Sequence, residues 1–360
     1  MAESILIVTE DTELLDDLLR LCAAAGAEAE VAHGALVKEG SWRSAPLVLV
    51  GDDRAGPLLG SLYGPARRPG VLLVGRDLDD HQVWERGVGI GAEHVVFLPD
   101  AESWLTGRIA DAAEGVGRQA LTVGVTGGRG GAGASTLACA LAVTAARAGQ
   151  RTVLIDADPL GGGLDVLLGG GSAEGLRWPA FAESRGRVGA VALEESLPRL
   201  HDLRVLSWDR GASVLVPPEA MRAVLGAARR RGGVVVVDLP RRMDEAVTEV
   251  LAQLDLGLLV VPAELRAVAA AHRVAGRLAM VLRDLRAVVR GPCGAGLGDA
   301  EIARLLGLPL AGELLPEKGL LESVDLGVPP GAMPNGPLAR FCSAFWARAL
   351  PSEGQGSVPA

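Results

Sequence analysis

Short apolar runs alternate with stretches of helical periodicity along the first third of the chain. Between residues 12 and 25, leucines and a cysteine recur on one side of a helix. Four apolar runs predict strands, at residues 5–8, 46–50, 70–74 and 94–98. Strands that alternate with helices at this spacing predict a parallel sheet covered on both faces. We therefore expect an α/β domain over residues 1–113.

A second α/β series follows a short polar segment. Residues 114–120 contain glycine and few large apolar side chains, which predicts a linker. Further strands are predicted at 121–125, 152–155, 204–207, 234–237, 257–261 and 286–289. Helical segments connect them, at 135–148, 218–230, 244–254, 267–283 and 299–306. This domain is expected to span residues 121–350, with 351–360 as a disordered tail.

Composition narrows the function classes. The 360-residue chain carries a net charge of −9, and its basic residues gather only at 229–231, so a specific nucleic-acid partner is not favoured. There is no apolar run of membrane-spanning length, and the first residues are acidic, so we expect a cytoplasmic protein. The four cysteines lie far apart, which favours buried thiols over a disulfide framework or a zinc site.

A glycine-rich segment lies between a predicted strand and an Ala/Leu-rich helix. Residues 126–136 read TGGRGGAGAST, and such a loop brings backbone N–H groups and a helix N-terminus to an anion. Gly128, Gly133 and Ser135 fit the phosphate-loop pattern GxxxxGK[ST], but Ala134 occupies the lysine position. The candidate nucleotide-binding residues are Gly128, Arg129, Gly130, Gly131, Ala132, Gly133, Ala134, Ser135 and Thr136.

Two acidic motifs follow in the order that a nucleotide site needs. Asp156 and Asp158 come at the end of a buried strand, where both carboxylates can face the ligand edge of the sheet. The alternative for this pair is that it caps its own loop. Asp238 ends the run VVVVD at 234–238, which has the form of a Walker B motif that holds a metal ion through water.

The segment 129–136 resembles the deviant Walker A motif of ParA/MinD proteins, KGGxGK[ST][ST]. The absence of the second lysine before "ST" is similar to the CpaE/TadZ branch, including the actinobacterial septum-site-determining (Ssd) proteins. The resemblance covers residues 121–350 and implies a ParA/MinD-type P-loop NTPase domain with a mostly parallel sheet. It also implies ATP and Mg²⁺ as cofactors and a homodimer formed through a nucleotide sandwich.

The same resemblance implies roles for single residues. Arg129 stands at the signature position that reaches the partner's phosphates, and Asp158 at the position that orients the attacking water; these are the candidate catalytic residues. Ser135, Asp156 and Asp238 are the candidate metal ligands.

On the base side of the site, the segment 308–316 is similar to the family's strand beside the nucleotide base, which makes Pro316 a binding candidate. Arg290 stands where relatives usually carry an asparagine that recognises adenine, a departure from the pattern.

The first domain resembles a response-regulator receiver, which CpaE-type proteins carry as a flavodoxin-like partner domain. Glu10 and Asp11 match the acidic pair of a receiver. Gly51 falls at the phosphate-acceptor position, with Asp52 and Asp53 displaced, and Leu98 replaces the lysine before the proline. We therefore expect a pseudo-receiver used for protein contacts or dimerisation; the alternative is phosphorylation of Asp52.

The resemblance and the missing lysine together predict a spatial regulator rather than a motor. Bound ATP and Mg²⁺ would act as a dimerisation switch that places septum or Flp/Tad pilus-secretion machinery, with weak or no hydrolysis. The alternatives are an active ATPase in which Arg129 compensates for Ala134, and a nucleotide-free scaffold. The helix predicted at 337–350 favours packing on the sheet; its alternative is peripheral membrane association at the cytoplasmic face, the cell pole or the septum.

Overall fold

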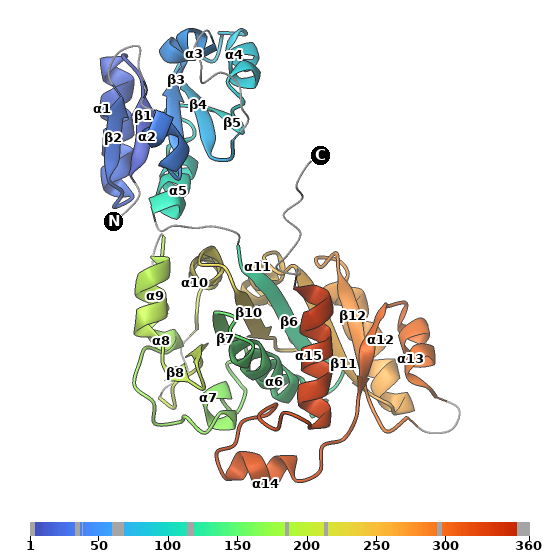
Figure 1. Ribbon diagram of the computed structural model, residues 1–360. Helices are drawn as coiled ribbons and strands as arrows, with labels where there is room; N and C mark the ends of the chain where they lie inside the picture. Colours follow the sequence, from blue (N-terminus) through green and yellow to red (C-terminus); the bar gives the residue numbers. More distant parts are fainter. Residues whose placement is uncertain are drawn as a thin grey trace. The chain divides into compact units, whose positions relative to one another are not determined.

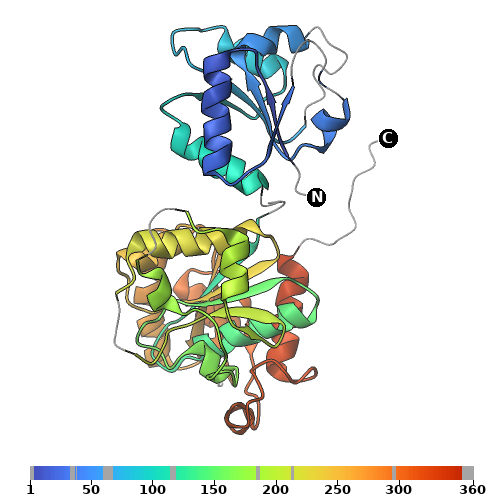
Figure 2. The ribbon, with the colours of Figure 1, turned by 90° about the vertical axis from the view of Figure 1, so that its left-hand side faces the viewer.

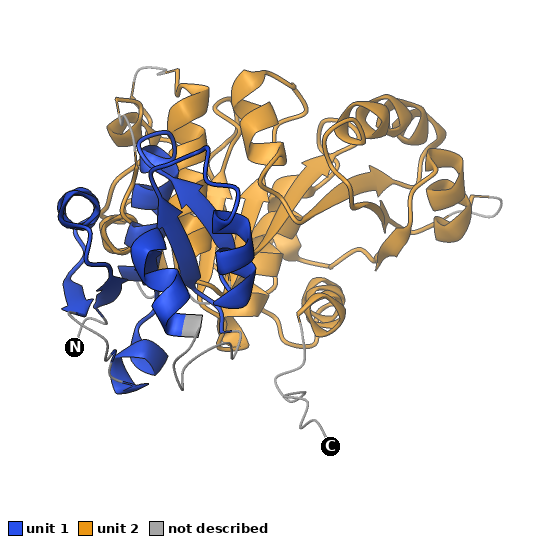
Figure 3. Cartoon of the chain, turned by 90° about the horizontal axis from the view of Figure 1, so that it is seen from above, with its two compact units in different colours: residues 1–117 blue, residues 118–360 orange. Residues whose placement is uncertain are grey.

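The computed structural model describes residues 4–32, 37, 39–59, 68–113, 119–183, 187–211, 215–293 and 297–350. The chain divides into two compact units, Met1–Gly117 and Arg118–Ala360 (Figure 3). Most of the expected linker, 114–120, and all of the expected tail, 351–360, lie outside the described residues. Those two boundaries therefore stay predictions.

The first unit is a five-stranded parallel sheet with the strand order β2-β1-β3-β4-β5. Its strands are β1 (Ile5–Val8), β2 (Ala29–Ala32), β3 (Val48–Gly51), β4 (Val71–Gly75) and β5 (His94–Phe97). Its helices are α1 (Thr12–Ala24), α2 (Glu39–Ser44), α3 (Asp52–Leu59), α4 (Val83–Gly89) and α5 (Glu102–Ala113). Sequence reasoning missed β2, an edge strand of sequence AEVA that is only partly buried and so lacks the apolar signal of its neighbours.

Both faces of this sheet are covered, as the alternation of elements predicted. Alternate residues of β1 belong to different clusters: Ile5 and Ile7 pack with α1 and α5, while Leu6 and Val8 pack with α3 and α4. Because β1, β3 and β4 are buried on two sides, their sequences are continuously apolar instead of alternating.

The second unit is an eight-stranded sheet with the order β13-β12-β11-β6-β10-β7-β9-β8. All neighbouring pairs are parallel except β8 with β9. Its strands are β6 (Leu121–Gly127), β7 (Thr152–Asp156), β8 (Arg199–Leu200), β9 (Leu203–Leu206), β10 (Val234–Asp238), β11 (Leu256–Pro262), β12 (Leu285–Arg290) and β13 (Leu310–Leu314). The predicted fold class, two α/β units with mostly parallel sheets, is confirmed.

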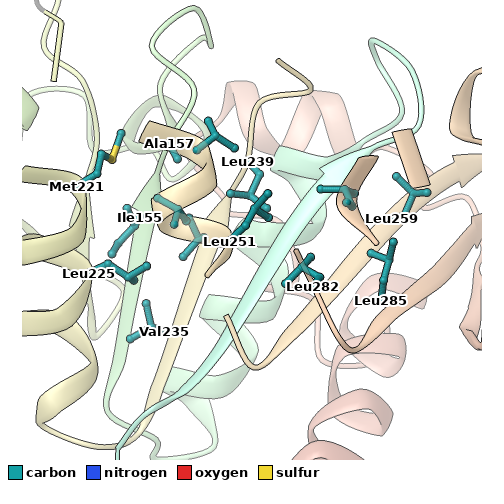
Figure 4. Close-up of a cluster of buried hydrophobic side chains, with 14 of the residues drawn as sticks. Ile155, Ala157, Met221, Leu225, Val235, Leu239, Leu251, Leu259, Leu282 and Leu285 are labelled. Carbon is teal, nitrogen blue, oxygen red and sulfur yellow. The ribbon is translucent and has the colours of Figure 1, made fainter. Parts of the chain in front are cut away.

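The helices of this unit form a layer on each face of the sheet (Figures 1 and 2). They are α6 (Ala134–Arg147), α7 (Leu164–Leu167), α8 (Trp178–Phe181), α9 (Ala190–Ser196), α10 (Pro218–Arg230), α11 (Glu245–Leu251), α12 (Leu265–Leu278), α13 (Asp299–Leu306), α14 (Leu320–Asp325) and α15 (Pro337–Ala349). Figure 4 shows the core on one face, where Met221 and Leu225 of α10 and Leu251 of α11 meet Ile155 and Val235 of the sheet.

On the opposite face, α6 and α15 lie next to each other, with α6 on the central strands and α15 against β13. Nearly all of α6 after its first turn is buried, which explains why its sequence is rich in Ala and Leu instead of amphipathic. The apolar side of α15 packs there through Leu338, Phe345 and Trp346, and the Trp346 indole N–H donates to the Leu141 carbonyl at 2.9 Å. The prediction of a closing helix packed on the domain is confirmed. Within the described residues, there is no helix that combines the length and the apolar character needed to cross a membrane.

We expect Trp346→Ala to destabilise the second unit by about 3–5 kcal/mol, because it removes a large side chain that is 4% exposed and leaves a cavity between α6 and α15. Urea titration of the full chain would measure the loss in the free energy of unfolding. Leu326→Ala, at a side chain 83% exposed in the same unit, is the control and should change that energy by under about 0.5 kcal/mol. Equal effects of the two substitutions would contradict the packing described for α15.

Candidate functional site

Three neighbouring strands bring the predicted site residues to one edge of the second sheet. β10 lies between β6 and β7, with Asp238 in register with Val125 of β6 and Asp156 of β7. Because the three strands are parallel, their carboxyl ends share this edge, where ligands bind in open α/β sheets. The loop after β6 therefore lies beside the carboxylates that end β7 and β10.

The loop from residue 128 to 133 depends on glycine at three positions. Gly131 and Gly133 have φ values of 68° and 97°, a region that residues with a Cβ rarely adopt. A Cβ on Gly128 would lie 2.5 Å from the Cβ of Ala271, so α12 approaches the loop too closely for any side chain there. The loop ends at Gly133, and α6 begins at Ala134 with its N-terminus facing the loop. This is the strand, loop and helix arrangement that binds phosphate through backbone N–H groups.

Ser135 and Asp238 meet at the foot of this loop. The Asp238 carboxylate is 4% exposed and forms a side-chain hydrogen bond with Ser135. Burial raises the pKa of Asp238 to about 7, and the nearby Asp156 and Asp158 charges add to the rise while the Ser135 hydrogen bond opposes it. A hydroxyl beside a carboxylate is a donor set that suits Mg²⁺, which is usually held by one or two carboxylates together with water and substrate phosphates.

The Asp156 carboxylate is 1% exposed and accepts three hydrogen bonds from its own surroundings. Oδ2 accepts from Ser207 Oγ at 2.9 Å and from the Leu164 N–H at 3.2 Å, and Oδ1 accepts from the Asp158 N–H at 3.1 Å. Burial raises its pKa to about 6 against these hydrogen bonds. In this structure Asp156 caps its loop, as the alternative for the acidic pair expected, and its role towards Mg²⁺ stays a prediction.

The backbone carbonyl of Asp156 also accepts two indole N–H groups. Trp178 Nε1 donates at 2.6 Å and Trp208 Nε1 at 3.1 Å, and the two ring centroids lie 5.8 Å apart. The sequence predicted neither these contacts nor that of Ser207. Their distances along the chain, 22 residues for Trp178 and 51 for Ser207, leave no local signal by which to find them.

The candidate catalytic residues come from two segments: Arg129 from the loop itself, and Asp158 from the chain after β7. Asp158 is half-buried and accepts from the Leu160 N–H at 3.0 Å, and it lines a cavity of 280 Å³ together with Trp208 and Arg242. Arg129 forms an ion pair of 2.8 Å with Glu264, the residue before α12. Arg129 is thus engaged by a carboxylate of its own chain.

A second cavity, of 510 Å³, opens beside the first turn of α6. Gly133, Thr136 and Pro316 line it, so the structure brings these predicted binding residues together. Five leucines give the cavity its apolar wall, which suits a flat aromatic ring; they are Leu314, Leu315, Leu320, Leu321 and Leu338. Arg290, Glu317 and Glu322 are the charged residues of the lining.

The receiver-like unit has no space for a side chain at the expected acceptor position. A Cβ on Gly51 would lie 2.3 Å from Asp53 Oδ1 and 2.5 Å from Thr9 Oγ1. Asp53 accepts from Thr9 Oγ1 at 2.7 Å, and Asp52 forms an ion pair of 2.6 Å with Arg86. Both displaced aspartates are therefore held by neighbouring side chains.

The residues present suit a magnesium–nucleotide complex better than a free metal ion. Within the described part of the chain, there is no group of three or more His, Cys, Asp and Glu residues arranged to hold a metal by itself. A glycine loop followed by Ser135 and Asp238 fits an ion whose remaining ligands are phosphate oxygens and water.

We expect Asp238→Asn to stabilise the second unit at pH 8. Because the folded-state pKa lies near 7 and the ordinary value is 3.8, the folded chain holds a proton between these values that the unfolded chain has released. Stability therefore falls as the pH rises through this interval, and above it the buried charge costs about 4 kcal/mol, which the substitution removes. Urea unfolding at pH 8 and pH 4 would measure the difference, which should nearly vanish at pH 4.

The matched control is Asp325→Asn, at an exposed aspartate of the same unit, which should show little change at either pH. A gain for Asp238→Asn that is the same at both pH values would contradict the assignment to a buried charge.

Comparisons with known proteins agree with this architecture. Residues 8–120 match the family model "Rv3660c-like, CheY-like N-terminal domain", and residues 123–216 match "CobQ/CobB/MinD/ParA nucleotide binding domain". The crystal structure of a ParA family ATPase from Chlorobium tepidum TLS superposes with a TM-score of 0.54 at 17% identity, covering 64% of this chain and 98% of that one. The MinD cell division protein of Aquifex aeolicus gives 0.52 at 20% identity, covering 67% and 99%. At such identities the likeness concerns the fold.

Relatives in sequence cover both units. The "Uncharacterized protein Rv3660c" of Mycobacterium tuberculosis (strain ATCC 25618 / H37Rv) is 39% identical over 322 residues, which are 88% of this chain and 90% of that protein. The septum site-determining protein MinD of Synechocystis sp. is 24% identical over 216 residues, 57% of this chain and 79% of its own. With a CheY-like domain followed by a MinD/ParA nucleotide-binding domain, the chain belongs to the Rv3660c-like branch of the ParA/MinD family.

Proposed function

We propose that this chain is a nucleotide-controlled spatial regulator. ATP and Mg²⁺ bind at residues 128–136 and stabilise a homodimer, and the dimer places division or pilus-secretion machinery in the cytoplasm. The observation that carries the proposal is the arrangement at one sheet edge of the glycine loop and the Ser135–Asp238 pair, next to the apolar 510 Å³ cavity. The loop would bind the phosphates, the Ser135–Asp238 pair the metal ion, and the cavity the base.

Ser135 and Asp238 would hold the Mg²⁺ ion, which supplies positive charge to the phosphate oxygens. The N–H groups of residues 131–136 and the positive end of α6 orient the phosphates. The base lies in the leucine-lined cavity with Pro316 at its side. Asp156 positions Asp158 through the Asp158 N–H and so sets the direction in which the half-buried Asp158 carboxylate points.

Hydrolysis is slow or absent in this proposal. Ala134 provides no ammonium between the β- and γ-phosphates, and the lost attraction amounts to roughly 1 kcal/mol in water and about 4 kcal/mol at an effective dielectric constant of 20. Asp158 alone can orient water but brings no positive charge to the γ-phosphate. Nucleotide therefore serves mainly to hold the dimer together.

The Arg129–Glu264 pair supports a switch between two arrangements of Arg129. In the protomer, Arg129 is engaged by Glu264, and both side chains are substantially exposed. In the nucleotide sandwich that the family resemblance implies, Arg129 leaves Glu264 and reaches the partner's phosphates. Exposed ion pairs contribute less than about 1 kcal/mol to stability. The phosphates of a nucleotide bound to the partner can therefore readily replace Glu264 as the partner of Arg129.

The receiver-like unit serves protein contacts in this proposal, and phosphorylation does not control it. Gly51 carries no carboxylate, Asp52 is paired with Arg86, and the buried Leu98 offers no ammonium. Trp84 and Val88 on α4 are 57% and 70% exposed, and Trp84 contacts Phe97 on the edge strand β5. Large apolar side chains exposed beside a sheet edge suit recognition of another protein.

The client is the division septum or the Flp/Tad pilus and secretion apparatus. MinD relatives that carry the words septum site-determining in their names support the first, and the CpaE/TadZ resemblance supports the second. The acidic net charge does not favour a nucleic-acid partner. The apolar side of α15 packs within its own unit, which does not favour peripheral membrane association through this helix.

We expect the full chain to bind ATP with Mg²⁺ in a saturable way, and Gly133→Asp to abolish that binding. The aspartate would have to adopt a φ of 97° and would place a carboxylate where the loop binds phosphate. Isothermal titration calorimetry with ATP would measure both affinities.

The control is Gly107→Asp in α5, where a Cβ meets nothing within 4 Å, and its affinity should equal that of the unchanged protein. Absence of any ATP binding would favour the nucleotide-free scaffold. Phosphate release in single turnover that exceeds a protein-free blank and disappears in Asp158→Ala would favour the active ATPase.

We expect Glu264→Gln to lower the dissociation constant of the ATP-dependent dimer about threefold. The substitution releases Arg129 from a surface ion pair, so that less energy is needed to bring Arg129 to the partner. Sedimentation velocity over a range of protein concentrations, with ATP and Mg²⁺, would measure the shift. Glu249→Gln breaks a comparable exposed pair with Arg222 and should leave the dimer unchanged. A weaker dimer in Glu264→Gln would mean that Glu264 supports the interface and would remove the switch.

A further inference from the structure

Arg290 lies on the outer side of the phosphate loop. It is the last residue of β12, and its Nη1 donates a hydrogen bond to the Gly131 carbonyl at 3.1 Å. The same nitrogen would be 3.3 Å from a Cβ placed on Gly133, the residue just before α6. The guanidinium is thus in contact with the segment whose N–H groups face a bound phosphate chain.

The charge of Arg290 is not neutralised by the described part of the chain. Arg129, the other arginine of the loop region considered so far, is paired with Glu264 at 2.8 Å. Arg290 has no ion pair among the described residues, and the Gly131 carbonyl engages one of its five N–H donors. Glu317 and Glu322 line the same cavity, but no ion pair within 4.0 Å joins either carboxylate to Arg290 in the described part of the chain.

The position of Arg290 would place it beside a bound nucleotide. It lines the 510 Å³ cavity together with Gly133, Thr136 and five leucines. A nucleotide with its phosphates on the loop and its base among the leucines would therefore lie in a cavity to which Arg290 contributes. Because the guanidinium is hydrogen-bonded to the loop, it lies on the phosphate side of this cavity.

We propose that Arg290 is a phosphate-binding residue that supplies, from the end of β12, positive charge that the loop lacks at Ala134. This proposal rests on the proposed function, since it concerns a nucleotide bound at the same loop. The free N–H donors of Arg290 bind the oxygens of the phosphate chain nearest α6. Its contact with Gly131 holds the guanidinium in place before the ligand arrives, which lowers the ordering cost of binding.

The experiment compares ligands that differ in their phosphates and variants that differ in charge. Full-length protein, Arg290→Gln and Arg290→Lys are titrated with ATP, ADP and adenosine in the presence of Mg²⁺. We expect Arg290→Gln to weaken ATP and ADP by roughly tenfold and to leave adenosine unchanged, because one charge–phosphate attraction is lost. Arg290→Lys keeps the charge and should recover part of the affinity.

Arg286→Gln is the matched control, since Arg286 lies on the same strand but pairs with Asp284 instead of the loop. Its affinities should equal those of the unchanged protein, and equal urea midpoints for all variants would show that they fold alike. Salt should weaken ATP binding less steeply in Arg290→Gln than in the unchanged protein.

The possible results separate the two proposals. If the unchanged protein binds none of the ligands, the proposed nucleotide function fails and this assignment fails with it. If the unchanged protein binds ATP and Arg290→Gln binds it equally well, the nucleotide function stands and the role of Arg290 is wrong. If Arg290→Gln weakens adenosine as much as ATP, Arg290 contacts the base, which also overturns the proposal.

Discussion

The in-register parallel pairing of β6, β10 and β7 is the constraint on which the second unit depends. It aligns Val125, Asp238 and Asp156 in one row, so that the carboxyl ends of three strands and the loop after the first meet at one edge. The pairing is held by apolar side chains on both faces, with Ile155 and Val235 towards α10 and α11, and Leu154 and Val236 towards α6. The carboxylates of Asp156 and Asp238 are consequently buried on neighbouring strands. Burial raises the pKa of both, because it disfavours the charged form. A cation bound between these carboxylates and a phosphate would offset that desolvation cost.

Features whose residues are close together along the chain could be predicted from the sequence, whereas contacts between distant segments could not. The common location of the glycine loop, Ser135 and Asp238 could be predicted because strand, loop and helix are contiguous and each has its own periodicity. The closing helix was found because its apolar spacing is regular. Ser207 could not be found as a partner of Asp156, since the contact depends on the neighbouring position of β7 and β9 in the sheet, which apolar runs do not specify. The edge strand β2 was missed because an edge is partly solvated and carries little apolar signal.

Basic side chains around the loop come from three different parts of the chain, and the structure distinguishes their roles. Arg129 belongs to the loop and is paired with Glu264, so its charge is available elsewhere only after that pair opens. Arg290 arrives from β12 and contacts the loop directly. Arg241 follows β10, and one of its guanidinium nitrogens would lie 3.6 Å from a Cβ on Gly130. Although Ala134 occupies the lysine position, the loop therefore still has cationic side chains close to it. Two of them, Arg241 and Arg290, come from other segments of the chain.

The two indoles that donate to the Asp156 carbonyl have a consequence for how this protein can be observed. Trp178 and Trp208 lie 5.8 Å apart, one buried and one half-buried, and both are hydrogen-bonded to the residue that also positions Asp158. A shift of that residue changes the polarity and the spacing around both rings at once. Their emission wavelength and their exciton-coupled circular dichroism would respond together. The unmodified chain thus carries an optical reporter beside the acidic half of its site, and no dye needs to be attached.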